Sequence, residues 1–493
     1  MSAYVLGVDI GTSACKVAIF DEIGVLKAQA TKEYPVYYPH PGWAEQNPEA
    51  WWQAVVIAIK EVVHESQVDP KCIAGIGIDG QSWSAIALDA KGNVLCNTPI
   101  WTDTRAQSIC DEVLATVPAS EIFAVCGNAM RPNYTLPKVL WYKRNLPEVY
   151  EKANTILQSN GYIAYCFTGV LSQDKSQGYG WQCYNMRTGT WNMELAKRLG
   201  IRTELLPPIV DCHTVIGGVT EKVAEETGLA VGTPVVAGGL DAACGTLGAG
   251  VVSAGQTQEQ GGQAGGMSLC IDEYVADERM IMGAHTVPNT WLLQGGTTGG
   301  GGTIKWFREQ FCPELSFAEM SELAETVPAG SDGVIFLPYM AGERSPIWNP
   351  KASGVFFGLN YAKTRAHLIR AVMEGVAYSL RHNLECVKEA GAKAGTLRAM
   401  GGAANSRIWT QIKADVTHCD IEVPASDTAT TWGAALLALV GTGLYEDFQT
   451  AVDASVAVTR SHTPNPDNKD IYDQGYVKYL ELYQRLSPMM NEC

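Results

Sequence analysis

The sequence lacks the signatures of several protein classes. Its 14 cysteines include no Cys-x-x-Cys pair and its eight histidines show no metal-ligand spacing, so a zinc site or a disulfide scaffold is not expected. No stretch reaches the ~20 apolar residues of a membrane-spanning helix. The N-terminus has no basic segment before an apolar run. Neither a Walker A loop nor a dinucleotide fingerprint occurs. We therefore expect a protein of the reducing cytoplasm.

Positive charge is also scarce. The chain has 36 Lys and Arg against 52 Asp and Glu, a formal net charge of −16 at pH 7. Nucleic acid or an acidic membrane would be repelled, so neither is expected as a partner. A nucleotide can still bind, because backbone N–H groups and one metal ion hold phosphates without a basic surface. A chain of 493 residues suggests about two to four domains.

The order of expected strands and helices indicates an α/β fold. Strands are expected over Tyr4–Ile10, Lys16–Phe20, Val25–Tyr34 and Ile73–Asp79, and helices over Trp51–Val63, Ala242–Gly250, Ile304–Gln310 and Arg365–Ala390. The last helix has apolar residues at three- and four-residue steps and stops at Gly391. We place a domain boundary after residue 250, giving domains 1–250 and 251–493. The two halves are compatible with two copies of one α/β plan.

Glycine is abundant, with 50 residues, and much of it is clustered in four turns that each follow a strand-like run. The turns are Gly11-Thr12-Ser13 after Asp9, Gly261–Gly266, Gly295–Gly302 and Gly401–Ser406. Glycine lets the backbone approach a ligand closely, and the helix expected after Gly301 and Gly302 would attract an anion at its N-terminus. One such turn is more often a plain tight turn, but four of them favour a phosphate-binding function.

Two aspartates lie where chemistry is expected. Asp9 ends a strand beside the first glycine turn, where a carboxylate can hold Mg²⁺; the alternative is an Asx turn. Asp241 follows Gly238-Gly239 and precedes a helix of small residues. It is a candidate general base that accepts the proton of a hydroxyl attacking a phosphoryl group. The alternative for Asp241 is a helix N-cap.

Several motifs resemble those of the FGGY carbohydrate kinases over essentially the whole chain. The segment 354–374 resembles the C-terminal signature of that family, and Lys138–Trp141 resembles the core of its N-terminal signature. Trp101, Asp103 and Arg105 also match, as does the opening 9–13. The resemblance implies two actin/hexokinase-like, ribonuclease H-like domains with the substrate in a cleft between them. It implies sugar binding on 1–250, nucleotide binding on 251–493, and ATP with Mg²⁺ as cofactors.

The resemblance also implies roles for individual residues. Asp241 falls on the catalytic base and Asp9 on the acidic residue near Mg²⁺. The sugar pocket is expected at Gln81, Ser82, Trp83, Asn133 and Asp241. The nucleotide is expected at Gly11, Thr12, Ser13, Lys16, Gly262, Gly301, Lys305, Gly401, Gly402 and Asn405. Within the family the chain is most similar to the kinases of D-xylulose, so the expected reaction converts D-xylulose to D-xylulose 5-phosphate.

Two positions depart from that pattern. Ser82-Trp83 replaces the usual Met-His, which exchanges an imidazole for an indole with one donor. The turn 261–266 replaces a Gly-Thr-Ser turn and lacks its hydroxyls. The alternatives are therefore a kinase of another ketose, a sugar acid or a polyol, or a catalytically weak sugar- or nucleotide-binding regulator.

Of the 13 Trp residues only Trp83 is expected to line a pocket, and Glu343-Arg344 is expected to form a surface or interdomain ion pair. The oligomeric state stays open, with a homodimer as one option.

Overall fold

The computed structural model describes residues 3–425 and 428–492, and the chain forms two compact units. The first unit comprises Met1–Val252, Met282–Leu292 and Thr428–Val456; the second comprises Ser253–Ile281, Leu293–Asp427 and Ala457–Cys493. The first crossing lies beside the boundary expected after residue 250. The chain then returns twice to the first unit, at Met282–Leu292 and at Thr428–Val456. A single boundary after residue 250 therefore does not separate the two units.

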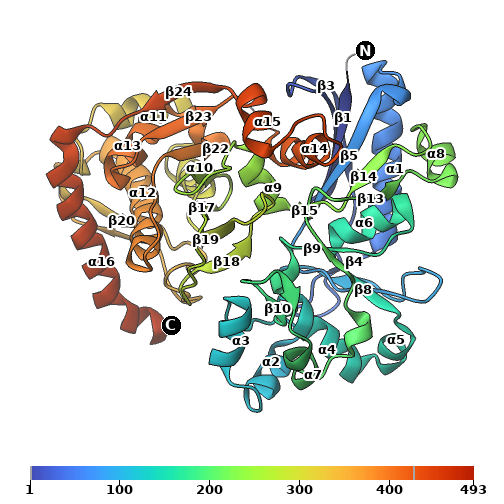
Figure 1. Ribbon diagram of the computed structural model, residues 1–493. Helices are drawn as coiled ribbons and strands as arrows, with labels where there is room; N and C mark the ends of the chain where they lie inside the picture. Colours follow the sequence, from blue (N-terminus) through green and yellow to red (C-terminus); the bar gives the residue numbers. More distant parts are fainter. Residues whose placement is uncertain (1–2, 426–427, 493) are drawn as a thin grey trace. The chain divides into compact units, whose positions relative to one another are not determined.

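The first unit is built on one large sheet with short strands around it (Figure 1). Its strands are β1 (Tyr4–Ile10), β2 (Ala14–Asp21), β3 (Leu26–Glu33), β4 (Glu45–Gln46), β5 (Ile73–Gly80), β6 (Ile86–Leu88), β7 (Thr98–Pro99), β8 (Thr155–Leu157), β9 (Gln173–Asp174), β10 (Tyr184–Asn185), β11 (Thr190–Trp191), β12 (Ile209–Val210), β13 (Val215–Gly218), β14 (Pro234–Val236) and β15 (Gly239–Leu240). Its helices are α1 (Pro48–Ser66), α2 (Gln107–Leu114), α3 (Ala119–Cys126), α4 (Thr135–Asn145), α5 (Pro147–Lys152), α6 (Ser159–Thr168), α7 (Met193–Arg198), α8 (Glu221–Thr227), α9 (Asp241–Gly248), α14 (Ala429–Gly441) and α15 (Phe448–Ser455).

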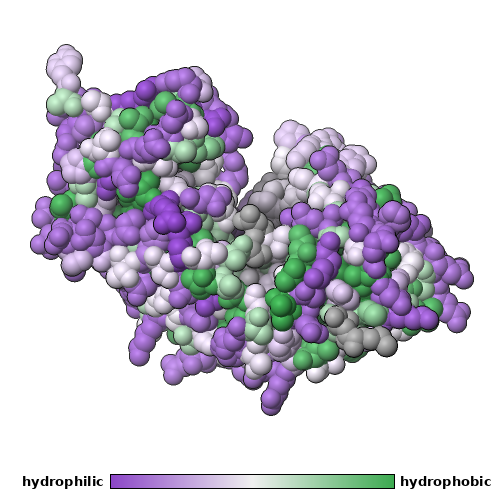
Figure 2. Space-filling model, turned by 90° about the horizontal axis from the view of Figure 1, so that it is seen from above, coloured by the Kyte–Doolittle hydropathy of each residue, from purple (hydrophilic) through white to green (hydrophobic). Residues whose placement is uncertain are grey.

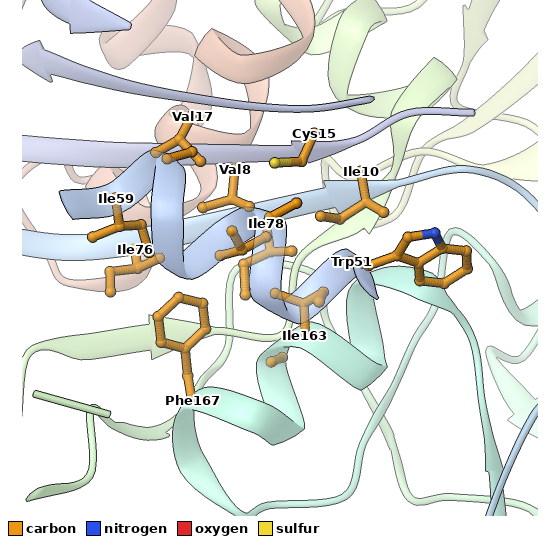
Figure 3. Close-up of a cluster of buried hydrophobic side chains, with 14 of the residues drawn as sticks. Val8, Ile10, Cys15, Val17, Trp51, Ile59, Ile76, Ile78, Ile163 and Phe167 are labelled. Atoms are coloured by element: carbon orange, nitrogen blue, oxygen red, sulfur yellow. The ribbon is translucent and has the colours of Figure 1, made fainter. Parts of the chain in front are cut away.

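The large sheet has the order β13-β14-β5-β1-β2-β3, and β15 also pairs with β5. β1, β2 and β3 form an antiparallel meander, whereas β5 runs parallel to β1. Alternate residues of a strand face opposite sides, so the side chains of β1 and β5 contribute to two different cores. Figure 3 shows the core beneath α1 and α6, where Val8, Ile10, Ile76 and Ile78 meet Ile59, Ile163 and Phe167.

The opposite face of this sheet is covered by α14, a helix of mostly small and aliphatic residues that returns from near the end of the chain (Figure 1). A Cβ atom on Gly77 of β5 would lie 1.7 Å from the carbonyl oxygen of Ala434. Only glycine permits this approach of helix to strand. The contact explains why residues 428–456 belong to the first unit.

The second unit repeats the strand plan. Six of its strands follow the order β19-β17-β16-β22-β23-β24; β16 is antiparallel to β17 and parallel to β22, and β23 is parallel to β22 and antiparallel to β24. The elements of this half of the chain are β16 (Thr257–Gly261), β17 (Gly265–Ile271), β18 (Ile281–Ala284), β19 (Trp291–Thr297), β20 (Ile335–Leu337), β21 (Val355–Phe357), β22 (Leu397–Met400), β23 (Ile421–Pro424), β24 (Val458–His462), α10 (Gly301–Phe311), α11 (Phe317–Glu325), α12 (Arg365–Glu389), α13 (Arg407–Thr417) and α16 (Lys469–Glu492).

The visible surface in Figure 2 is mainly hydrophilic, with apolar residues scattered over it. Among the described residues, no helix is both long enough and apolar enough to span a membrane. This agrees with the sequence, where no apolar run reaches that length.

Candidate active site

Three carboxyl groups of the first unit meet at the ends of its central strands. Asp9 on β1 lies opposite Asp79 on β5 in the parallel register. Gly239 on β15 pairs with the same Asp79, which brings Asp241, two residues later, to this end of the sheet. The turn that carries Asp241 needs Gly238, whose φ is +80° and whose added Cβ would lie 2.1 Å from the Ile78 carbonyl oxygen.

This carboxylate cluster carries more negative than positive charge. Asp79 is fully buried, and neither of its oxygens receives a hydrogen bond from an N–H or hydroxyl group in the described parts of the chain. Burial, then the charges of Asp9 and Asp241, raise the pKa of Asp79 well above its ordinary value. Burial also raises the pKa of Asp9, and two neighbouring carboxyl groups that were both ionised would repel each other. Lys16, opposite Asp9 on β2, opposes both shifts.

Asp241 is the first residue of α9, and the N-cap position belongs to Leu240. Its side chain is half-buried, and Oδ1 accepts a hydrogen bond of 2.6 Å from the backbone N–H of Ala242. The expected alternative, a capping aspartate, is therefore not the observed geometry. Burial, then the charge of Asp9, raise the pKa of Asp241 to about 7. A carboxyl group with this pKa can accept a proton near neutral pH.

The glycine turn after β1 is held by side chains from three segments. The Tyr34 hydroxyl donates to the Gly11 carbonyl at 2.6 Å, and Gln46 Nε2 donates to the Thr12 carbonyl at 2.8 Å. Trp101 Nε1 donates to Thr12 Oγ1 at 2.9 Å. The turn thus presents Ser13 as its exposed residue, next to the strand that carries Asp9. The predicted phosphate residues Gly11, Thr12, Ser13 and Lys16 all lie at this end of the sheet.

The predicted sugar residues lie on adjoining loops of the same unit. Gln81 directly follows β5 and donates to Gln46 Oε1 at 2.9 Å. Trp83 is held in a left-handed conformation with a φ of +60°, and its ring lies edge-on to Tyr134 at 4.6 Å between centroids. Ser82, between Gln81 and Trp83, is half-buried, as is Asn133, which precedes Tyr134. The structure therefore brings Gln81, Ser82, Trp83 and Asn133 to neighbouring loops.

The second unit contains a cavity of about 870 Å³. Five of the residues predicted to bind the nucleotide line it: Gly262, Gly301, Lys305, Gly402 and Asn405. Gly401 does not line the cavity but contacts Gly261, which does. A Cβ atom on Gly401 would be 3.0 Å from the Gly261 carbonyl oxygen. Phe317, Met373 and Trp409 supply apolar walls. Trp409 corrects the expectation that only Trp83 among the tryptophans lines a pocket.

The N-terminus of α10 differs from the expected anion site. The backbone N–H groups of Gly301 and Gly302 donate to the carbonyl oxygens of Gly262 and Gln263 at 2.7 and 2.9 Å. These donors are therefore engaged within the protein and do not point to an open anion site.

The sequence analysis missed Asp79 and misjudged Glu343. Asp79 lies near the end of its strand and precedes Gly80, much as Asp9 lies near the end of its strand two positions before Gly11, and that repeated pattern was the available signal. Glu343 is buried and accepts hydrogen bonds from the backbone N–H groups of Thr298 and Arg344 at 2.8 and 2.7 Å. The expected surface or interdomain ion pair at Glu343-Arg344 is therefore wrong, because Glu343 instead holds a glycine-rich turn.

A divalent cation fits the carboxylate cluster only with help from other ligands. In the described parts of the chain no three His, Cys, Asp or Glu side chains converge as a metal-binding group. Mg²⁺ is commonly held by one or two carboxylates plus substrate phosphates. Asp9, at the edge of a buried cluster with excess negative charge, suits that arrangement.

Two α/β units of one strand plan, a carboxylate cluster in one and a glycine-lined cavity in the other, define a phosphotransferase-type protein. The chain matches the N-terminal domain of the FGGY family of carbohydrate kinases over residues 4–248 and its C-terminal domain over residues 267–442. It belongs to this family and is a carbohydrate kinase of the xylulokinase-like kind.

Individual relatives extend over nearly the whole chain. A xylulose kinase of Staphylococcus epidermidis is 31% identical over 485 residues, covering 98% of this chain and 96% of the relative. The crystal structure of xylulose kinase from Rhodospirillum rubrum superimposes with a TM-score of 0.93 at 30% identity, covering 99% of this chain and 100% of that one. The gluconate kinase structure from Lactobacillus acidophilus gives a TM-score of 0.92 at 27% identity, covering 100% of both chains.

Proposed function

We propose that the protein transfers the γ-phosphate of ATP to a small ketose, most specifically that it converts D-xylulose to D-xylulose 5-phosphate. The observation that carries the proposal is Asp241, a half-buried carboxyl group with a pKa of about 7 at the end of a glycine-flanked turn. The xylulose kinases among the relatives support D-xylulose as the acceptor. We further propose the domain roles 1–250 for the sugar and 251–493 for the nucleotide.

In this proposal Asp241 accepts the proton of the attacking hydroxyl. Gln81, Ser82, Trp83 and Asn133 orient the sugar, and the cavity of the second unit holds the adenosine part of ATP. Asp9 would hold Mg²⁺, which, when bound with ATP, supplies positive charge to the phosphates. Lys16 adds a fixed positive charge opposite Asp9, and the turn Gly11–Ser13 contributes backbone N–H groups.

The test is an ADP-release assay over ketoses, aldoses, sugar acids and polyols. The expected result is the highest kcat/KM on D-xylulose or a closely related ketose. A gluconate preference would reassign the acceptor to a sugar acid, in keeping with the gluconate kinase among the similar structures. Absence of sugar-dependent ADP release on the whole panel would refute the kinase proposal.

A second candidate is a catalytically weak sugar- or nucleotide-binding regulator. The observation that favours it is the engagement of the Gly301 and Gly302 N–H groups by the turn 261–266, which also lacks hydroxyl side chains. Calorimetry with ATP and with adenosine separates the two candidates. A kinase should bind ATP more tightly than adenosine, whereas equal affinities would show that the phosphates are not held.

A further inference from the structure

A buried polar network centred on Asp174 lies next to the residues predicted to bind the sugar. This residue ends β9 and is 2% exposed. Its Oδ1 accepts hydrogen bonds from Ser176 Oγ at 2.5 Å and from the Gln177 backbone N–H at 3.0 Å. Its Oδ2 accepts from Asn160 Nδ2 at 2.9 Å and from Gln173 Nε2 at 3.3 Å. Burying a carboxyl group costs much free energy unless hydrogen bonds compensate, so a network this complete is well suited to fix positions.

One arm of the network reaches the turn that carries the candidate base. Ser176 Oγ donates to Asp174 and accepts the backbone N–H of Leu240 at 2.8 Å. Leu240 is the N-cap of α9, and Asp241 follows it directly. The backbone N–H at the start of this turn is therefore tied to Asp174 through a single hydroxyl group.

The other arm reaches the candidate sugar pocket. Gln177 Oε1 accepts the backbone N–H of Trp83 at 3.2 Å. Gln177 Nε2 is in turn fixed by Asn160 Oδ1 at 2.9 Å, and Asn160 also donates to Asp174. A left-handed conformation is strained for a non-glycine residue and persists only when its surroundings enforce it. Gln177 is part of that enforcement at Trp83, whose φ is +60°.

We propose that Asp174 is a positioning residue that holds the candidate base and the sugar-binding turn in a fixed relation, through Ser176 on one side and Gln177 on the other. The proposal rests on the proposed function of the site, since it concerns the same base and pocket. Neither arm touches a reacting atom. Each arm fixes one backbone N–H group, and the two groups lie in segments more than 150 positions apart in the sequence.

The two arms predict different kinetic effects. Ser176→Ala releases the Leu240 N–H and should lower kcat about 10- to 100-fold, because misplacing a reacting group by about 1 Å can cost about 100-fold; KM for the sugar should stay within about twofold. Gln177→Met keeps the volume but frees Trp83, and should raise KM for the sugar about tenfold with kcat and KM for ATP little changed. Asp174→Asn has one acceptor oxygen instead of two and should show both effects.

The matched control is Glu374→Gln in the second unit. Glu374 is also 2% exposed and accepts hydrogen bonds from Gly330, Ser331, Arg370 and Tyr472. It should lower thermal stability without separating kcat from KM for the sugar. If Ser176→Ala and Gln177→Met also fail to separate kcat from KM for the sugar, the positioning role is wrong. The single-arm variants keep the test open if Asp174→Asn does not fold.

Hydrogen–deuterium exchange provides a readout that does not need turnover. Ser176→Ala should speed exchange of the Leu240 amide at least about tenfold while leaving Trp83 unchanged, and Gln177→Met should do the reverse. Unchanged exchange at both amides would overturn the proposal. If the unaltered protein phosphorylates nothing on the sugar panel, the proposed function fails, and this exchange pattern still decides whether Asp174 organises the two turns.

Discussion

The central strands of the two units can be compared residue by residue. In the first unit, β1 carries Asp9 two positions before Gly11; in the second, β16 carries Glu259 two positions before Gly261. Glu259 forms a buried ion pair with Lys413 at 2.6 Å. Asp9 faces Asp79 instead, and it has no cation within ion-pair distance in the described parts of the chain. The same position in the same strand plan thus has a cation partner in one unit and faces a second carboxyl group in the other.

This difference separates a carboxylate that has a structural partner from one that has none within its unit. A buried ion pair repays its desolvation only when both partners are present, so Glu259 and Lys413 together leave the second sheet electrically balanced. The cluster of Asp9, Asp79 and Asp241 is not balanced from within its unit. Protons or bound cations must supply the missing charge, which is the behaviour expected of a site that binds a metal–nucleotide complex and takes up a proton.

The largest effect should come from removing the proposed proton acceptor of the first unit, Asp241. Asp241→Asn keeps the size and the hydrogen bond to Ala242 but cannot take a proton, so kcat on the best sugar should fall by roughly 10²–10⁴-fold or more. ATP affinity, measured by calorimetry, should persist. The control is Glu259→Gln, which alters the corresponding sheet of the second unit and should retain a much larger share of kcat. Near-normal turnover of a folded Asp241→Asn protein would defeat the assignment.

The next largest effect should come from breaking the balance of the second unit. Lys413→Met strands the buried carboxylate of Glu259 and should lower the free energy of unfolding by about 3–5 kcal/mol, measured by urea denaturation. Replacing both partners by methionine should recover most of that loss. Lys16→Met in the first unit is the matched control, and it should cost much less because Lys16 is half-buried and makes no ion pair within the described residues. Equal losses for Lys413→Met and Lys16→Met would contradict the comparison.

Local sequence patterns predicted the elements around the site well. The strand 4–10 is confirmed, β2, β5, α10 and α12 lie close to their expected ranges, and the two-unit α/β class is confirmed. These elements have clear apolar periodicity or glycine stops, which are local signals. The resemblance to the kinase family named Asp9 and Asp241 of the carboxylate cluster and five residues that line the second-unit cavity, but neither Asp79 nor Trp409.

Long-range contacts were beyond the sequence signals. The return of α14 to the first sheet depends on a close approach of Gly77 to the Ala434 carbonyl oxygen, where an added Cβ would lie only 1.7 Å away. Neither residue alone indicates this contact in the sequence. Nothing in the local sequence around Asp174 and Gln177 indicates that both are buried in the folded protein and that Gln177 contacts Trp83. The engagement of the Gly301 N–H group likewise depends on a distant turn. Such features follow from tertiary packing rather than from local preference.

A smaller effect is expected at the turn of Ser82 and Trp83, the candidate sugar-binding turn. This turn is not part of the comparison between the central strands of the two units. Trp83→Phe preserves the aromatic contact with Tyr134 but removes the indole, and should change KM for the sugar by an amount worth about 1–3 kcal/mol. Ser82→Ala should also act on the sugar rather than on ATP. Initial rates with either substrate varied measure both KM values. Trp51→Phe, a substitution at a buried tryptophan of α1, is the control, and equal changes in the KM of sugar and ATP would indicate a merely structural role.

The smallest effect per step should be the pH dependence of stability without ligands. The carboxyl cluster of the first unit contributes to it together with Glu343 and Glu374 of the second unit, whose pKa values burial also raises. Burial raises the pKa of Asp241 from 3.8 to about 7 and raises those of Asp9 and Asp79 as well. The folded state therefore holds protons that the unfolded state has lost, so stability is greatest below the ordinary carboxyl pKa and declines as pH rises toward about 7. Each extra proton contributes a slope of at most about 1.4 kcal/mol per pH unit. Urea denaturation between pH 5 and pH 8 measures it. Asp241→Asn should reduce the slope by the share that Asp241 contributes, and Glu259→Gln should not reduce it, because Glu259 is paired with Lys413. A slope that survives Asp241→Asn unchanged would place the excess protons elsewhere.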